Sequence, residues 1–476
     1  MSHSPVLVDE SLLGTETNLV VGRNPGNSAE SAHGALFYPP KDVVEGFPSP
    51  LSENLLTSCI RKVPSETRAK ELLRRRGVPK LEDLEGKSVE DKIAALAYLQ
   101  YAYNPPLAAA RFTQKVLASV RASLLLRNPE DRRYWQFLYQ QGQVLRGGRP
   151  IAMPQFLRSL QGAGFILAGP SGVGKTALVQ RLRALIGQEP VLVNWGGDAP
   201  AQMTFIPMVV VKWPECGTLA GLLANFRQVL ISEIGPSVAT DYHFSNFMGS
   251  NGTNAAISAA LLLNLGLFVL DGGCIRSLRG EFRDILGFIS TLQRNSGIPT
   301  LITCTYPVLQ AIARSGGAGA NTASAHAEFL DLLPPGPLWA SYCKFFWNLG
   351  LAEPCIPMPG YIPSLMWKFS RGDMGIMSQG FSGLHHALLD HPQLLAGEAL
   401  KETDASDIVC MRLRMYEETV KVLELFQTNR AVPLEDLWAH GDYLPYEAFN
   451  ETPSRDFERR LSRRKSPVSS ILTHAE

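Results

Sequence analysis

The chain has 476 residues, of which 45% are hydrophobic and 19% are charged, and its formal net charge is +1. This is the composition of a globular protein with room for two or three domains, and it excludes a chain that is disordered throughout. A net charge near zero neither requires nor excludes a nucleic-acid partner, because only a local basic surface matters for that contact.

The sequence offers no feature of a secreted or membrane-spanning protein. Its seven cysteines form no CxxC pair and no Cys/His pattern with metal-ligand spacing, which is typical of reduced thiols. The first ten residues lack a basic stretch followed by an apolar run. The longest apolar stretch, Ala255–Leu270, is shorter than the ~20 residues of a spanning helix and is interrupted by Ser258 and Asn264. We therefore expect a cytoplasmic protein with no membrane contact.

The first part of the chain predicts an irregular arm followed by helices. Residues 1–50 are rich in Gly, Pro, Ser and Asn and show no periodicity. Residues 51–146 contain helical apolar spacing, most clearly in Ser88–Tyr103 and Ala108–Leu126. Residues 1–150 are therefore assigned to an N-terminal arm and helical extension.

From Phe165 onward, short apolar runs alternate with helical segments. This alternation predicts an α/β fold with a parallel sheet that is covered by helices on both faces. The predicted strands are Phe165–Ala168, Met208–Val211, Leu267–Leu270 and Thr300–Cys304, and the predicted helices are Ala177–Leu185, Leu219–Glu233, Ala255–Leu263 and Glu281–Arg294.

The segments after the last predicted strand are mainly helical. The glycine-rich stretch Arg314–Ala327 is expected to be a loop, and residues 331–395 are expected to form a small helical lid. Together with the sheet, this lid gives a predicted domain at 151–395. Residues 396–476 are predicted to hold one good helix, Asp407–Gln427, and a polar tail. The tail carries the basic residues Arg459, Arg460, Arg463, Arg464 and Lys465.

A P-loop follows the first predicted strand. Residues 169–176 match G-x-x-x-x-G-K-[ST] fully, and a strand precedes and a helix follows them, as the motif requires. In such loops the backbone N–H groups and the start of the helix face the phosphates. Lys175 is expected to reach the β- and γ-phosphates, and Thr176 to hold Mg²⁺. The sequence therefore predicts an ATP and Mg²⁺ site. Its binding residues are Gly169, Pro170, Ser171, Gly172, Val173, Gly174, Lys175 and Thr176.

A second acid for this site is predicted at Asp271. Four apolar residues precede it, which places a carboxylate at the carboxyl end of a strand, where ligands of parallel sheets bind. Asp271 is expected to complete the Mg²⁺ shell. The alternative is that Asp271, Gly272 and Gly273 form only a turn after a core strand.

Thr305 is a second candidate for a catalytic role. It follows the strand Thr300–Cys304, so its hydroxyl is expected at the same sheet edge as the P-loop, within reach of a γ-phosphate. The alternative, equally supported, is that Thr305 caps the turn before Pro307.

Several other clusters have a structural alternative that we favour. Candidate contacts to DNA phosphates are Arg74–Arg76, Arg276, Arg279, Arg283 and the tail Arg459–Lys465, each with a solvated surface as the alternative. His385, His386 and His391 lack acidic or cysteine partners at ligand spacing, so surface or packing roles are expected. The aromatic cluster Trp339, Phe345, Phe346 and Trp347 is expected in the core of the lid.

From about Arg111 to His391 the chain resembles TnsC, the AAA+ regulator of heteromeric bacterial transposons, including CRISPR-associated transposons. Phe165–Leu182 looks like its P-loop unit, and Val209–Leu230, with Gly217-Thr218-Leu219 and Asn225-Phe226, is the most family-specific match. The remaining matching segments are Arg111–Pro129, Ile285–Leu309 with Gly297-Ile298-Pro299, and Ser370-Arg371-Gly372 near the second sensor.

The chain also departs from this family at positions that matter for turnover. Hydrolysing AAA+ proteins usually carry Glu directly after the second acid, where it polarises the attacking water, and this chain has Gly272. The family's Gly-Thr at the first sensor is Cys304-Thr305 here, and its arginine-rich stretch after the sensor is reduced to Arg314. We therefore expect nucleotide binding to be intact and hydrolysis to be weak.

The resemblance implies an ATP-dependent assembly on double-stranded DNA, as a homo-oligomeric ring or filament, in the bacterial cytoplasm. It further implies a role as adaptor between a target-selection protein of the TniQ/TnsD type and a TnsB-type transposase, with a TnsA-type endonuclease as a possible third partner. Two alternatives stay open: a STAND-like switch that acts through protein partners, and a helicase-loader-like NTPase.

Overall fold

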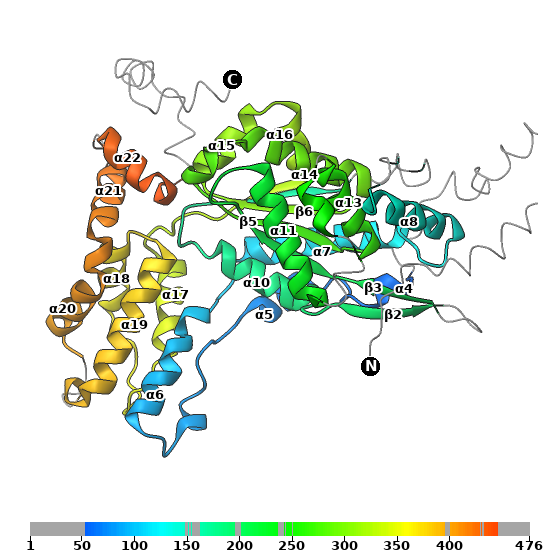
Figure 1. Cartoon of the computed structure of the whole chain (residues 1–476). Helices are drawn as coiled ribbons and strands as arrows, with labels where there is room; N and C mark the ends of the chain where they lie inside the picture. The colour runs from blue at the N-terminus through cyan, green and yellow to red at the C-terminus, as the bar shows by residue number, and fades with distance from the viewer. Residues whose placement is uncertain are drawn as a thin grey trace, which may run out of the picture.

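The computed structural model describes residues 53–147, 151, 154, 162–195, 201–236, 242, 244–249, 251–395, 400–428, 430 and 433–445. The N-terminal arm at 1–50 and the basic tail Arg459–Lys465 lie outside these residues, so the expectations for both stay predictions. Figure 1 shows a central sheet flanked by helices and, beside it, a group of helices that forms the lid.

Five parallel strands form the central sheet in the order β4-β5-β6-β1-β7. These strands are β1 (Gly164–Ala168), β4 (Met208–Lys212), β5 (Leu267–Gly273), β6 (Thr300–Cys304) and β7 (His326–Phe329). The residues of β1 and β6 are buried throughout, because helices cover both faces of the sheet. The predicted α/β core is therefore confirmed.

The expected loop Arg314–Ala327 is wrong in part. It contains the short helix α16 (Gly317–Thr322) and the first two residues of β7, which pairs with β1 at the sheet edge. The antiparallel hairpin of β2 (Val191–Trp195) and β3 (Ala201–Phe205) was also not predicted. An edge strand and a hairpin bury fewer side chains than a central strand, so the apolar signal is weaker.

One face of the sheet is covered by α10 and by helices of the N-terminal extension. These are α4 (Leu55–Ser58), α5 (Glu66–Leu73), α7 (Leu107–Leu126) and α10 (Lys175–Ile186). Their buried side chains pack with Phe165, Leu167 and Val269 of the strands in one hydrophobic cluster. The helices α4, α5 and α7 of the N-terminal extension therefore share one hydrophobic core with this face of the sheet.

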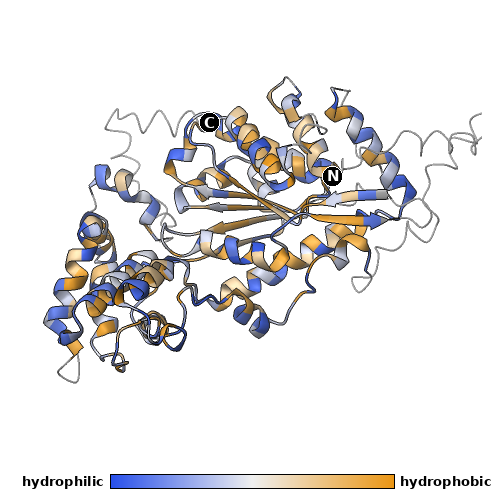
Figure 2. Cartoon of the chain, turned by 60° about the horizontal axis from the view of Figure 1, so that its bottom comes forward, coloured by the Kyte–Doolittle hydropathy of each residue, from blue (hydrophilic) through white to orange (hydrophobic). Residues whose placement is uncertain are grey.

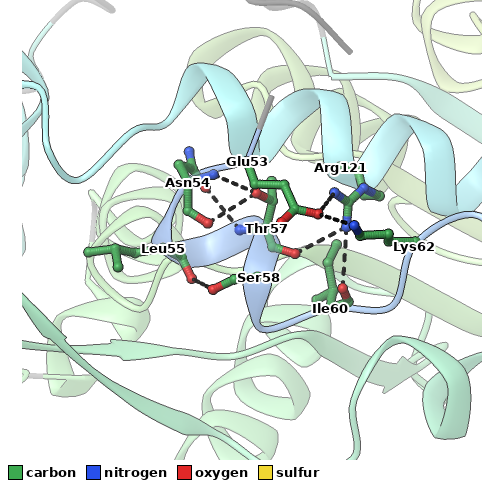
Figure 3. A network of polar contacts seen from close by, with 8 residues as sticks. All are labelled: Glu53, Asn54, Leu55, Thr57, Ser58, Ile60, Lys62 and Arg121. Atoms are coloured by element: carbon green, nitrogen blue, oxygen red, sulfur yellow. Dashed lines mark hydrogen bonds and ion pairs between the residues drawn. The ribbon is translucent and has the colours of Figure 1, made fainter. Parts of the chain in front are cut away.

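Polar contacts fasten the start of this extension to α7 (Figure 3). Asn54 caps α4 by accepting from the backbone N–H of Thr57, and its amide donates to the carbonyl of Leu124 at 2.8 Å. Arg121, on α7, donates to the carbonyl of Thr57 and pairs with Glu53. These contacts satisfy polar groups of a four-residue helix that has too few turns to be stable alone.

The opposite face of the sheet packs against a second layer of helices. These are α8 (Arg132–Leu145), α11 (Leu219–Ile234), α13 (Gly252–Leu262), α14 (Phe282–Ser296) and α15 (Tyr306–Arg314). In Figure 2 the strands are mostly hydrophobic and lie between helices whose outer surfaces carry the hydrophilic residues. This pattern is that of a sheet buried between two helical layers.

The lid has its own hydrophobic core. It is built from α17 (Pro337–Trp347), α18 (Ile362–Ser370), α19 (Met374–Asp390) and α20 (Glu402–Leu413), and α6 (Val89–Leu96) of the extension packs against it. The hydrophobic core of the lid therefore extends past residue 395 into α20. The aromatic cluster is buried here as predicted, with exposed fractions of 1% for Trp339, 7% for Phe345, 4% for Phe346 and 7% for Trp347.

The segment after α20 leads back toward the sheet. Here α21 (Glu417–Gln427), α22 (Leu434–His440) and the 3-10 turn η8 (Gly441–Tyr443) follow one another, and η8 contacts α15. The expected single helix Asp407–Gln427 is divided by the 3-10 turn η7 (Arg414–Tyr416).

The other 3-10 turns are η2 (Glu82–Leu84), η3 (Ala97–Tyr101), η4 (Phe244–Met248), η5 (Ile275–Leu278) and η6 (Pro392–Leu395). None of the described helices is long and apolar enough to cross a membrane.

Candidate nucleotide-binding site

The P-loop joins the carboxyl end of β1 to the first turn of α10, as the sequence predicts. Gly172 and Gly174 have φ angles of 88° and 93°, which L side chains rarely adopt. A side chain at Gly169 would also collide with the carbonyl oxygen of Leu330, 1.9 Å from an ideal Cβ. Glycine is therefore required at these positions for the loop to curl.

Lys175 is directed back onto the loop that it follows. Its ammonium group donates hydrogen bonds of 2.6 Å to the carbonyl oxygens of Gly169 and Pro170. Burial lowers the pKa of Lys175 to about 8, while the carboxylates of Asp373, Asp442 and Asp271 act against that change. The lysine thus holds its positive charge in a buried place surrounded by three acids.

Asp271 lies beside the P-loop and is 1% exposed. Both its carboxylate oxygens are 3.4 Å from the hydroxyl of Thr176. Its Oδ1 accepts a hydrogen bond of 2.5 Å from the hydroxyl of Thr303, and its Oδ2 lies 2.5 Å from the ammonium group of Lys212. The structure thus brings together the two predicted Mg²⁺ ligands, Thr176 and Asp271, and adds two polar neighbours that the sequence did not indicate.

Gly272, the residue after this acid, is exposed and has a φ of 93°. Its N–H donates to the hydroxyl of Thr303 at 2.9 Å, and nothing lies within 4 Å of an ideal Cβ at this position. Glu281, a possible substitute acid, accepts instead from the N–H of Leu219 at 2.8 Å, at the start of α11. Gly272 therefore supplies no carboxylate that could polarise a water molecule. The carboxylate of Glu281 is bonded to the start of α11 instead.

Thr305 is buried at the end of β6, as predicted, but its hydroxyl contacts a residue from the far end of the chain. It donates a hydrogen bond of 2.6 Å to Oδ1 of Asp442. The same carboxylate oxygen accepts from the N–H of Ile275 at 2.9 Å, and the carbonyl of Asp442 accepts from the N–H of Ser171 at 2.6 Å. Asp442 therefore connects the P-loop, η5 and the end of β6.

A lid residue also faces the P-loop. Asp373 caps α19 through a hydrogen bond of 2.9 Å from the N–H of Ile376, and it is fully buried. Its two carboxylate oxygens would lie 2.3 Å and 2.6 Å from a Cβ at Gly172. Burial raises the pKa of Asp373 to about 7, against the opposing effects of the Ile376 and Gly375 N–H groups and of Lys175. Within the described part of the chain its Oδ2 has no hydrogen-bond partner.

The donor set fits a nucleoside triphosphate with Mg²⁺. The glycine conformations provide a concave backbone that any side chain would fill, which is the condition for close approach of phosphates. Lys175 supplies a cation, and the oxygens of Thr176 and Asp271 are the hard ligands that Mg²⁺ prefers. When bound, Mg²⁺ neutralises phosphate charge, and these residues would hold it.

Among the predicted DNA contacts, Arg283 is exposed on α14 and the basic tail lies outside the described residues, while the others divide into two groups. Arg74 lies 5.0 Å from the ring of Phe345, Arg75 lies 5.3 Å from the ring of Tyr101, and Arg76 donates to the carbonyls of Val78 and Asn348. Arg74 and Arg76 thus connect the extension to the lid, whereas Arg75 packs within the extension, and all three have a structural role. In contrast, Arg276 and Arg279 are exposed on and after η5, beside the nucleotide site.

The three histidines of the lid differ in exposure, because His385 is buried, His386 is half-buried and His391 is exposed. His385 is 2% exposed, and its Nε2 lies 2.9 Å from the carbonyl oxygen of Phe346. Burial lowers the pKa of His385 to about 4, so the ring is neutral at pH 7. No group of three His, Cys, Asp or Glu side chains that could hold a metal occurs among the described residues.

Comparison with known proteins finds structural similarity of low score. No protein-family model and no curated protein matches the sequence. A Walker-type ATPase of Pyrococcus abyssi is similar in structure, with a TM-score of 0.31, 13% identity, and coverage of 63% of this chain and 92% of that one. Cdc6p from Pyrobaculum aerophilum is also similar in structure, with a TM-score of 0.32 and 13% identity, and the match covers 67% of this chain and 88% of that one. The fold assignment rests on the sheet order, the P-loop after β1 and the lid, and these make the chain an α/β protein with an AAA+-type P-loop core.

Proposed function

We propose that this protein is an ATP-dependent, oligomerising regulator of DNA transposition of the TnsC type, which binds double-stranded DNA. One observation carries the proposal: Lys175, Thr176 and Asp271 meet at one site, while Gly272 stands where a hydrolysing enzyme carries its glutamate. Such a site holds ATP and Mg²⁺ without rapid turnover. A long-lived bound state suits a protein whose assembly, and not mechanical work, is controlled by nucleotide.

The resemblance of several separate segments narrows the proposal from any P-loop NTPase to this type. One of them is Gly217-Thr218-Leu219. Gly217 has a φ of 66°, and its carbonyl accepts from the N–H of Glu281, while the hydroxyl of Thr218 caps α11 by accepting from Gly221. This segment therefore sets the position of the chain that follows β5. Glu281 completes the contact by capping Leu219.

DNA contact is assigned to the exposed arginines near η5. Arg276 and Arg279 are exposed and follow the carboxyl end of β5, the strand that carries Asp271, by a few residues. Arginine contacts to phosphates are independent of base sequence and weaken as salt rises. Nucleotide-driven assembly would align these side chains from successive subunits along one duplex, and Arg314, exposed after β6, would be available to a neighbouring subunit.

The partners follow from the same proposal. A TniQ/TnsD-type protein would select the target, a TnsB-type transposase would be recruited, and a TnsA-type endonuclease would be a third partner. Within this assignment the protein reports the presence of an assembled oligomer on DNA to the transposase.

The test is the size of the particle in solution. Sedimentation velocity of the full chain with a 60-base-pair duplex should show a large complex only with Mg-ATP or a non-hydrolysable analogue. The Lys175→Ala variant should form no large complex under the same conditions, because it lacks the lysine that is expected to contact the nucleotide phosphates. A wild-type protein that stays monomeric with DNA and nucleotide together would contradict the proposal.

A further inference from the structure

The turn η8 lies on the nucleotide site through both its backbone and its side chain. The carbonyl of Asp442 accepts from the P-loop N–H of Ser171 at 2.6 Å, and its Oδ1 accepts from the hydroxyl of Thr305 at 2.6 Å. Ile275 donates its N–H to the same oxygen at 2.9 Å. A carboxylate from a position 137 residues after Thr305 thus takes donors that surround the expected phosphate position.

The flanking residues of η8 are fixed on both sides of Asp442. Gly441 is buried so tightly that an added Cβ would lie 2.6 Å from Cδ1 of Ile275. Leu444 is 1% exposed and packs with Val422 and Leu423 of α21. These contacts bury apolar surface, so η8 is held in place by packing as well as by the hydrogen bonds of Asp442.

The docked segment is joined to the lid. Glu424, on α21, pairs with Arg371 at 2.7 Å, and Gln427 donates to the carbonyl of Arg371 at 2.9 Å. Two residues after Arg371, Asp373 places its carboxylate over Gly172. The lid and the segment after it therefore present two acids, Asp373 and Asp442, to one P-loop.

These acids oppose a triphosphate in two ways. Asp442 carries the same sign of charge as phosphate, as does Asp373 when it is ionised, and charge repulsion is stronger in a buried place than in water. Asp442 also uses two hydrogen-bond donors that a bound anion would need, one in the P-loop and one in Thr305 directly after β6. Lys175 is a cation that offsets these charges in part.

We propose that Gly441–Leu444 is an internal acidic ligand of the nucleotide site, which competes with the triphosphate and must withdraw when nucleotide binds. The inference rests on the proposed binding of ATP. It adds that the described arrangement is a closed, resting form, held by the chain's own C-terminal segment. Because Asp442 belongs to a segment connected to the lid, withdrawal of η8 would accompany lid movement.

The test compares the affinity of full-length variants for a fluorescent ATP analogue. Asp442→Ala removes the acceptor of two hydrogen bonds and should bind the analogue about tenfold more tightly than the wild type. Asp442→Asn keeps an acceptor oxygen but loses the charge, so its affinity should lie between the two. Glu435→Gln, which changes an exposed acid on α22, is the matched control and should bind like the wild type.

Hydrogen exchange gives a second measurement that does not depend on any variant folding. In the wild type, the nucleotide should slow exchange in the P-loop and speed it in residues 441–444. Unchanged affinity in Asp442→Ala, with 441–444 still protected when nucleotide is bound, would overturn the inference and leave the proposed function standing. Slower ATP turnover in Asp442→Ala with unchanged affinity would also overturn it, since Asp442 would then be an acid that serves catalysis. Failure of every variant to bind nucleotide would overturn the proposed function as well.

Discussion

The ammonium group of Lys212 lies 2.5 Å from Oδ2 of Asp271, which is the carboxylate predicted to hold Mg²⁺. Lys212 is the last residue of β4 and is largely exposed, whereas Asp271 is 1% exposed. A lysine thus supplies positive charge to one oxygen of the expected Mg²⁺ ligand. The ammonium group thereby balances the charge of a buried carboxylate.

Lys212→Met should therefore make the protein more dependent on Mg²⁺. Loss of the ammonium leaves a buried carboxylate with only hydroxyl partners, which should lower the free energy of unfolding by about 1–3 kcal/mol. Addition of Mg²⁺ without nucleotide should recover part of this loss and raise the melting temperature of the variant more than that of the wild type. Equal effects of Mg²⁺ on both proteins would show that Lys212 does not take the metal's place. Lys212→Arg is the control that keeps the charge.

Gly272→Glu should raise ATP turnover above the slow rate expected for the wild type. Space for the side chain exists, because nothing lies within 4 Å of an ideal Cβ at this position. The φ of 93° adds backbone strain on the order of 1–3 kcal/mol to any non-glycine residue, so Gly272→Ala is the matched control. Phosphate release should be faster in Gly272→Glu than in both the wild type and Gly272→Ala. Brisk release by the wild type would mean that another residue positions the water.

Asp373→Asn should stabilise the protein at neutral and alkaline pH. Burial raises the pKa of Asp373 from 3.8 to about 7, so the folded state holds a proton that the unfolded state has lost between these values. The stability of the wild type should therefore fall as pH rises from about 4 to about 7, by up to about 4 kcal/mol for a shift of three units. Asparagine caps a helix as well as aspartate and carries no charge.

Urea unfolding at pH 5 and pH 8 tests this expectation. The advantage of Asp373→Asn over the wild type should be larger at pH 8. The same difference at both pH values would mean that Asp373 is ionised throughout the folded range.

Lys175→Ala should abolish nucleotide binding, because the P-loop then lacks its cation and keeps the carboxylates of Asp373 and Asp271 nearby. Isothermal titration with ATP and Mg²⁺ measures this loss directly. Arg183→Ala, which changes a cation on the same helix that pairs with Glu233 away from the loop, is a suitable control. An unchanged affinity in Lys175→Ala would remove the basis for the site.

The parts of the structure with a strong local signal could be predicted from the sequence. The strands before the P-loop, Asp271 and Thr305 each show a short apolar run, and their carboxyl ends lie at one sheet edge as expected. Thr303 could have been found, since it precedes Thr305 by two residues and alternate strand residues share a face. Lys212 likewise directly follows a predicted strand.

The lid-side acids could not be predicted because their role depends on tertiary contacts. Asp373 has a helix-capping pattern but no sequence feature that places it over Gly172. Asp442 is brought to Thr305 by the packing of Leu444 and of α21, far from the motif in sequence. In β7, one glutamate and one histidine interrupt the apolar pattern, so an edge strand there resembled a loop.

Binding to non-specific double-stranded DNA, measured by fluorescence anisotropy at a fixed 100 mM salt (~10 Å screening length) with and without Mg-ATP, tests the proposed function most directly. Tight binding only with Mg-ATP, lost in Lys175→Ala and weakened in the double variant of Arg276 and Arg279, is the result that we predict. Absence of binding in both conditions, with nucleotide binding intact, would contradict a role on DNA and would favour a switch that acts through protein partners.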